Sequence, residues 1–181
     1  MIYIGADHGG FQLKEKIKVW LKEWGVEFED VGAKSLDPED DYPEFAFAVA
    51  EKVGAQDDNV IPWKQAAKGI LLCRSAAGMV IAANKVCGVR AVAVTDEKAA
   101  RHSREHNNAN VIGISGDWTD ENQAQKILKV WLDTEFSKEA RHRRRVGHIA
   151  MYETPMGCCG GGGEQCSHGA GLGCKCGGDH D

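Results

Sequence analysis

Apolar residues along the chain fall into short, continuously apolar runs separated by longer amphipathic stretches. The runs 68–73 and 88–94 read as buried strands, as parallel strands are. Two further strands are predicted over 1–5 and 110–115, and a strand of alternating character over 26–32. Apolar residues at helical spacing predict six helices, over 11–25, 44–55, 77–85, 96–106, 119–133 and 136–153. In the first helix, Gly25 suits the position just past a helix end.

The predicted elements alternate in the order βαβαβαβαβαα. This order predicts an α/β fold, a Rossmann-like three-layer α/β/α sandwich with a five-stranded parallel sheet. In such sheets, ligands bind beyond the carboxyl ends of the strands, so the residues that follow each strand are the first candidates for function. Residues 56–68 read as a loop or a short insertion that could alter the rim of such a site.

The last part of the chain does not share this pattern. The chain has 181 residues, about the size of one domain, and we expect the folded domain to span 1–152. The tail, 153–181, is rich in glycine and cysteine and poor in large apolar side chains, so we expect it to be disordered. Zinc or another soft metal is a speculative ligand of this tail, through Cys158, Cys159, Cys166, Cys174, Cys176, His168 and His180.

Composition narrows the classes of partner. The formal net charge is −5, so no overall basic field favours nucleic acid. The apolar run at the N-terminus is too short for a signal peptide. No stretch approaches the roughly 20 apolar residues that a membrane span needs. We therefore expect a cytoplasmic protein that binds neither nucleic acid nor membranes.

Polar or reactive residues follow two of the predicted strands. Asp7 and His8 come after the first strand, where they could hold a polar ligand, although Asp7 could equally cap the following turn. Cys73 ends the third strand, before a loop of small residues whose N–H groups could stabilise an anion. A thiolate base needs such a setting. The alternative is that Cys73 simply packs in the core, because cysteine is among the most buried residue types.

Two further groups lie on predicted helices. His106 ends the fourth helix, where it could act as a general acid or base near neutral pH, or simply favour the helix dipole. Arg141 and Arg145 are four residues apart and share a helix face. Two guanidinium groups on one face suit a phosphate, although a solvated basic surface would show the same pattern.

Taken together, the chain resembles the ribose-5-phosphate isomerase type B family, which includes the galactose-6-phosphate isomerase subunits. The resemblance covers residues 1 to about 152 and rests on GADHGGFQLK, DYPEFA, GILLC, AGMVIAANKVCGVRAVAV, SREHNNANVIGIS and ARHRRRV. It implies an enzyme of carbohydrate metabolism, in the pentose phosphate pathway. The implied reaction interconverts ribose 5-phosphate and ribulose 5-phosphate through an enediolate, with no cofactor and no metal in the active site.

The resemblance also implies a role for each candidate residue. Cys73 matches the base that moves a proton between C1 and C2, Ser75 the hydroxyl beside it, and His106 the group that opens the sugar ring. The backbone of the loop after Cys73 matches the part that stabilises the enediolate oxygens. Substrate contacts are implied at Asp7, His8, Tyr42, Arg74, Ala76, Ala77, Gly78, Asn107, Arg141 and Arg145. Family members are dimers or larger assemblies, with the site at a subunit interface, so a homodimer or homotetramer is expected.

The chain departs from the family pattern at two loops. The family loop usually reads C-G-T-G-x-G, whereas here it reads C-R-S-A-A-G, so Arg74 and Ala76 stand in place of glycines. If these positions need a positive φ, side chains there cost energy and reshape the loop. Arg74 could instead favour the thiolate form of Cys73 or contact the substrate.

The second departure follows the fifth strand. The family often has an arginine there that contacts the ligand, and this chain has Asp117 at about that place. Two alternatives to a ribose-5-phosphate isomerase therefore stay open. One is an isomerase of a six-carbon aldose 6-phosphate, and the other is a sugar-phosphate-binding protein without catalytic activity.

Overall fold

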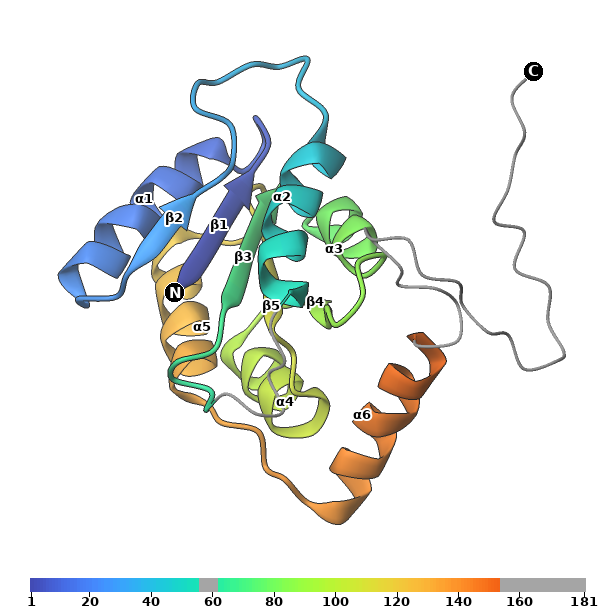
Figure 1. Cartoon of the computed structure of the whole chain (residues 1–181). Helices are drawn as coiled ribbons and strands as arrows, with labels where there is room; N and C mark the ends of the chain where they lie inside the picture. Colours follow the sequence, from blue (N-terminus) through green and yellow to red (C-terminus); the bar gives the residue numbers. More distant parts are fainter. Residues whose placement is uncertain (56–61, 154–181) are drawn as a thin grey trace, which may run out of the picture.

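The strands and helices follow one another in the predicted order (Figure 1). The computed structural model describes residues 1–55 and 62–153. The elements are β1 (Ile2–Ala6), α1 (Phe11–Glu23), β2 (Phe28–Asp30), α2 (Tyr42–Gly54), β3 (Lys68–Cys73), α3 (Ala77–Ala83), β4 (Ala91–Ala93), α4 (Glu97–Asn107), β5 (Val111–Ser115), α5 (Glu121–Asp133) and α6 (Ala140–Glu153). The largest differences from the predicted bounds are in β2 and β4, the two strands at the edges of the sheet, and in α6, which begins at Ala140; each is about four residues shorter than predicted.

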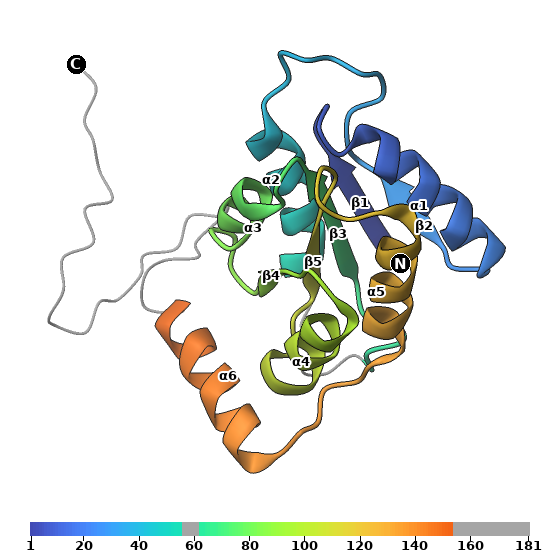
Figure 2. The ribbon, with the colours of Figure 1, turned by 180° about the vertical axis from the view of Figure 1, so that it is seen from behind.

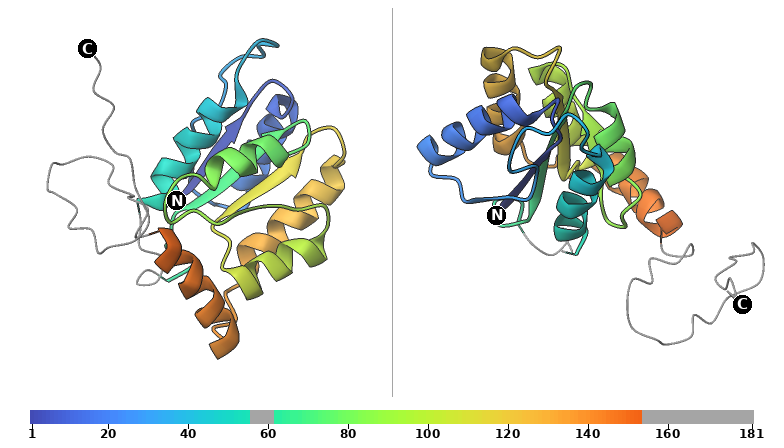
Figure 3. Two further views of the ribbon diagram at one scale, coloured as in Figure 1. Left: turned by 90° about the vertical axis from the view of Figure 1, so that its right-hand side faces the viewer. Right: turned by 90° about the horizontal axis from the view of Figure 1, so that it is seen from above.

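The five strands form one parallel sheet in the order β2-β1-β3-β5-β4. Helices α1, α4 and α5 cover one face, while α2 and α3 cover the other (Figures 2 and 3). The predicted three-layer α/β/α fold is therefore confirmed. Helix α6 lies outside these layers, beside α4 (Figure 1).

Side chains of the central strand β3 alternate between the two faces, as strand geometry requires. Ile70 and Leu72 belong to the core beneath α1 and α5, which includes the fully buried Trp131. Leu71 and Cys73 belong to the core beneath α2 and α3. The thiol of Cys73 therefore points toward α2 and α3 at the end of the strand.

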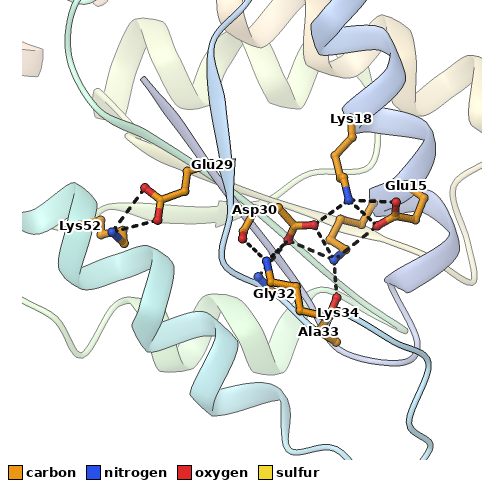
Figure 4. Close-up of polar contacts among 9 residues, drawn as sticks. Glu15, Lys18, Glu29, Asp30, Gly32, Ala33, Lys34 and Lys52 are labelled. Atoms are coloured by element: carbon orange, nitrogen blue, oxygen red, sulfur yellow. Dashed lines mark hydrogen bonds and ion pairs between the residues drawn. The ribbon is translucent and has the colours of Figure 1, made fainter.

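A buried ion pair fixes the end of β2 and the beginning of the loop that follows it (Figure 4). Lys14 is fully buried, and its Nζ donates to both carboxylate oxygens of Asp30, at 3.0 and 2.9 Å, and to the Ala33 carbonyl. The Nζ of Lys18 donates to Asp30 as well, at 2.7 Å. Burial raises the pKa of Asp30, but the hydrogen bonds from Lys18 and Lys14 outweigh it, so the net shift is downward. These contacts thus fix the position at which the loop between β2 and α2 begins.

The described part of the insertion before β3 packs at the edge of the sheet where the strands begin. The Lys68 ammonium and the Arg104 guanidinium each lie over the ring of Trp63, at 4.4 and 3.3 Å from its centroid. Its Nε1 donates to the carbonyl of Leu132 at 3.1 Å. Burial, followed by the charge of Arg104, lowers the pKa of Lys68 to about 8. Trp63 therefore lies away from Cys73 of its own chain, which is at the other end of β3, and the effect of the insertion on the rim of a site stays a prediction.

The predicted tail lies outside the described residues, apart from Glu153. Glu153 is the last residue of α6, and its carboxylate accepts a hydrogen bond from the Gly88 N–H at 3.1 Å. The disorder and metal binding of 153–181 stay predictions. Among the described helices, none combines the length and the apolar character of a membrane span.

Candidate active site

Three loops meet at the carboxyl edge of the sheet, which we define as the edge where β1, β3 and β5 end. The Gly116 N–H donates to the Cys73 carbonyl at 2.8 Å, and the Asp117 N–H donates to the Arg74 carbonyl at 3.2 Å. A Cβ atom on Gly9 would lie 2.3 Å from Cγ of Arg74, and one on Gly116 would lie 2.4 Å from the Gly9 carbonyl oxygen. Only glycine at these two positions permits such close packing of the three loops.

Cys73 lies at the centre of this edge. It is the last residue of β3, pairs in register with Ser115 of β5, and is 6% exposed. The next residue, Arg74, is exposed. Cys73 therefore packs in the core and borders the surface loop at the same time. The geometry is compatible with both readings of the sequence, so its role as a base stays a prediction.

The loop between Cys73 and α3 has the backbone shape that suits an oxyanion. Ala76 has φ 64° and ψ −20°, in the left-handed region, which costs a residue with a side chain about 1 kcal/mol. Arg74 is not among the residues with positive φ, so a side chain there causes no such strain. Within the described part of the chain, the N–H groups of Ala76, Gly78 and Met79 have no acceptor. The loop can therefore present N–H groups to a negatively charged oxygen.

Two other predicted residues adjoin this loop. The Ser75 hydroxyl accepts a hydrogen bond from the Ala77 N–H at 3.4 Å, so it lies over the beginning of α3. The Tyr42 ring, from the first residue of α2, lies against Gly78, because a Cβ atom there would be 2.8 Å from two ring carbons. The structure therefore brings Tyr42 and the Cys73 loop together, as a shared site requires.

Asp7 and His8 lie at the same edge, after β1. Asp7 is 4% exposed, and its Oδ1 accepts from the Gly10 N–H at 3.0 Å, so it does stabilise the turn. Burial is the largest influence on its carboxyl and raises the pKa of Asp7. His8 contacts Asp40 through Nδ1, at 2.6 Å from Oδ1, and its backbone N–H donates to the same oxygen at 3.1 Å.

Asp40 is a residue that sequence reasoning missed. Its side chain is 10% exposed, and its Oδ2 is buried with no hydrogen-bond partner among the described residues. One ligand atom each from Asp7, His8 and Asp40 lies within 4.8 Å of the others, a spacing that would suit a cation. However, the contact between Nδ1 of His8 and Asp40 already explains the arrangement as a hydrogen-bonded pair. Asp40 therefore orients the imidazole and leaves its Nε2 for other partners.

The Asp40 contact predicts a measurable change in the titration of His8. The hydrogen bond to Asp40 is the main cause that raises the pKa of His8 above its ordinary 6.5. Stability from this pair is therefore present below pH 6.5 and is lost as the pH rises through the raised value. We expect Asp40→Asn to lower the pKa of His8, as followed by NMR titration of the imidazole. The matched control is Asp37→Asn, in the same loop, where Oδ1 accepts from the Glu39 N–H. An equal titration of His8 in wild type and Asp40→Asn would contradict the assignment.

The remaining predicted residues form a second group around the end of α4. The ring of His106 contacts the rings of His102 and His142 in tilted arrangements, with centroid distances of 4.6 and 4.3 Å. His142 is 3% exposed, and burial, followed by the charge of His106, lowers its pKa. Arg141 pairs with Glu139 at 2.9 Å, and Arg145 is exposed on α6. Asn107 follows His106 as the last residue of α4.

The two groups lie at opposite edges of the sheet within one chain. Helix α4 returns the chain to the amino edge, where β3 and β5 begin, and there the Gly69 N–H donates to the Asn110 carbonyl at 2.9 Å. Cys73 is four residues further along β3, about 13 Å at roughly 3.3 Å per residue. His106 therefore lies about a strand length from the thiol of its own chain. The structure does not unite all the predicted residues in one protomer.

A parallel α/β sheet with polar loops at its carboxyl edge defines the class of proteins that bind small ligands beyond the strand ends. Comparison with known proteins specifies the family. The model of the ribose/galactose isomerase family matches residues 2–149. Ribose-5-phosphate isomerase B of Mycolicibacterium paratuberculosis is 40% identical over 152 residues, which is 84% of this chain and 91% of the relative. A putative sugar phosphate isomerase of Bacillus subtilis is 37% identical, over 84% of this chain and 96% of the relative.

Solved structures agree with these matches. Ribose-5-phosphate isomerase B of Mycoplasma genitalium, with bound ribulose 5-phosphate, superposes with a TM-score of 0.77 at 39% identity, over 84% of this chain and 95% of that one. The type B enzyme of Trypanosoma cruzi gives a TM-score of 0.74 at 39% identity, over 84% and 97% of the two chains. The chain belongs to the ribose/galactose isomerase family, which confirms the resemblance found in the sequence.

Proposed function

We propose that this protein interconverts ribose 5-phosphate and ribulose 5-phosphate, with Cys73 as the base. The observation that carries the proposal is the position of Cys73, buried at the end of the central strand beside a loop with unpaired N–H groups. The relatives named as ribose-5-phosphate isomerase B, and the relative that holds ribulose 5-phosphate, support the choice of substrate.

The chemistry needs a base and a stabilised oxyanion. The proton on C2 of the open-chain aldose is weakly acidic, and its removal places negative charge on the C1 oxygen. In the proposed mechanism the Cys73 thiolate removes that proton and returns it to C1, while the proton of the C2 hydroxyl passes to the C1 oxygen, so that C2 becomes the carbonyl carbon of the ketose. The N–H groups of Ala76 and Gly78 stabilise the enediolate oxygens, and the Ser75 hydroxyl lies beside them. No step of this transfer requires a cofactor.

The separation of the two groups of residues supports a site shared between two copies. His106, which opens the sugar ring in this proposal, lies about a strand length from Cys73 of the same chain. We therefore assign His106, Asn107, Arg141 and Arg145 to the site that contains the Cys73 of a second copy. Exposed apolar side chains suit such contact: Phe47 and Ile81 on α2 and α3, and Ile149, Met151 and Tyr152 on α6. A two-fold homodimer would then contain two equivalent sites.

A panel of aldose phosphates tests the proposed reaction. The full chain, incubated with ribose 5-phosphate or with six-carbon aldose 6-phosphates, is expected to convert the five-carbon substrate with the highest kcat/KM. Formation of the ketose is followed by its absorbance or by a coupled assay. Preference for a six-carbon substrate would replace the assignment. Tight binding of ribose 5-phosphate without turnover by the wild type would instead identify a binding protein.

A further inference from the structure

The two departures from the family loops lie in contact with each other. Nε of Arg74 donates to Oδ2 of Asp117 at 2.9 Å, although the residues are 43 positions apart. Hydrogen bonds to the backbone already hold Asp117 close to Arg74. The Asp117 backbone N–H donates to the Arg74 carbonyl at 3.2 Å, and the Ser115 hydroxyl donates to the same carbonyl at 2.5 Å. The ion pair therefore joins two loops that the backbone already holds together.

The guanidinium of Arg74 is only partly used by this contact. Among the described residues, neither of its two Nη atoms donates a hydrogen bond. Its aliphatic stem crosses Gly9, where any side chain would collide with Cγ. The side chain thus extends over the carboxyl edge, fixed at Nε and open at the two outer nitrogens, which is the geometry that receives two oxygens of one anion.

The Arg74 side chain points away from the Cys73 thiol, the proposed site of proton transfer. The Cys73 thiol points into the core beneath α2 and α3, whereas the Arg74 stem lies against the loop after β1. The guanidinium therefore lies on the far side of the strand end from the thiol. A substrate whose C1 and C2 lie at Cys73 would contact Arg74 through a group further along the molecule, away from the reacting carbons.

An anionic ligand needs a cation at this edge, because several carboxylates lie there. The carboxylates of Asp7, Asp40 and Asp117 would repel an anionic ligand. Arg74 and, when protonated, His8 lie among these carboxylates, and the two are close enough for the charge of Arg74 to act on His8. Of these two side chains, Arg74 is the one whose positive charge is lasting, because arginine does not lose its proton.

We propose that Arg74, oriented by Asp117, binds the phosphate of the substrate from the same protomer that supplies Cys73. The proposal rests on the proposed function for the identity of the substrate, and it makes Arg74 a binding residue and Asp117 a positioning residue. Stability alone does not account for the pair. The Arg74 and Asp117 side chains are 70% and 41% exposed, and ion pairs of such exposure contribute little to folding.

The test compares phosphate binding with turnover in the full-length protein. Calorimetry with inorganic phosphate as the probe is expected to show about tenfold weaker binding, or worse, for Arg74→Gln, because a charge-assisted hydrogen bond is lost. The same variant is expected to raise the KM for ribose 5-phosphate by a similar factor, with kcat within about threefold of wild type. The matched control is Arg101→Gln, an exposed arginine on α4 outside both groups of site residues, which is expected to leave both values unchanged.

Asp117 is tested through Arg74. Asp117→Asn is expected to weaken phosphate binding about threefold when Arg74 is present and to have no effect in the Arg74→Gln background. Asp117→Glu, which keeps the carboxylate, is expected to restore most of the loss. Stronger phosphate binding by Asp117→Asn would show that Asp117 masks Arg74 and would overturn its positioning role.

Unchanged phosphate binding by Arg74→Gln would reduce the pair to a surface contact and overturn the whole proposal. Failure of the proposed function looks different. It would appear as absence of ribose 5-phosphate turnover in the wild type, while the calorimetric loss in Arg74→Gln would still report on the anion site.

Discussion

Cys73→Ser is expected to lower kcat for ribose 5-phosphate by about 10² to 10⁴, the usual range for loss of a general base. Serine is close to cysteine in size, but its hydroxyl is far less acidic than a thiol and forms an anion much less readily. The position at the end of β3 and the neighbouring loop stay in place, so substrate binding is expected to change little. Steady-state kinetics and calorimetry with ribose 5-phosphate measure the two effects separately.

A structural role for Cys73 would give a different result. The residue packs in the core beneath α2 and α3, where a polar replacement also lowers the free energy of unfolding. Met79→Leu is the matched control, because Met79 is fully buried in the same core and the exchange nearly conserves volume. This control is expected to keep kcat. If Cys73→Ser retained activity within tenfold of wild type, or if Met79→Leu lost as much activity, the base assignment would be wrong.

The fold was predictable because its signals are local. The buried runs and helical spacings give the order of elements, and that order specifies a parallel sheet with the ligand side at the strand ends. Cys73 and the pair Asp7 and His8 could be placed at one edge on that basis alone. The shortening of β2 and β4 was not predictable, since pairing on only one side lets an edge strand end early.

The contacts that complete the site are long-range and left no sequence signal. Asp40 meets His8 across 32 positions, and Asp117 meets Arg74 across 43. In the sequence, Asp40 reads as one more acidic residue in a polar loop, and Asp117 as a lost cation. Only the folded chain shows that the charge of Arg74 lies beside Asp117. Neither departure can therefore be judged separately from the other.

The position of His106, by contrast, could have been inferred from topology. A helix that follows a strand in a parallel sheet returns the chain to the amino edge before the next strand begins. A residue at the end of α4 must therefore lie away from a residue at the end of β3. A site that uses both residues requires a second copy of the chain, and this requirement leads to a decisive experiment.

Mixing two inactive variants is expected to restore activity if the site is shared between copies. Cys73→Ala removes the proposed base, and His106→Ala removes the group that we propose to open the ring. In a mixed dimer, one site carries both changes, while the other combines an intact Cys73 with an intact His106 from the partner. Random pairing of equal amounts makes half of the dimers mixed, so about a quarter of the wild-type activity is expected. Joint refolding, or co-expression with two different tags, supplies the mixed dimers, and the ribose 5-phosphate assay measures the recovery.

Recovery must arise because the two substitutions are on different chains, and not from mixing itself. Cys73→Ala paired with a Cys73→Ala/His106→Ala double variant contains no intact combination, so this control is expected to remain at the level of Cys73→Ala. If each site were built from one chain, the mixture would show only the mean of the two separate variants. That outcome would also require the roughly 13 Å between Cys73 and the amino edge to close within a protomer. The five consecutive register pairs that join β3 to β5 oppose such a movement, because they would have to break for the sheet to shorten.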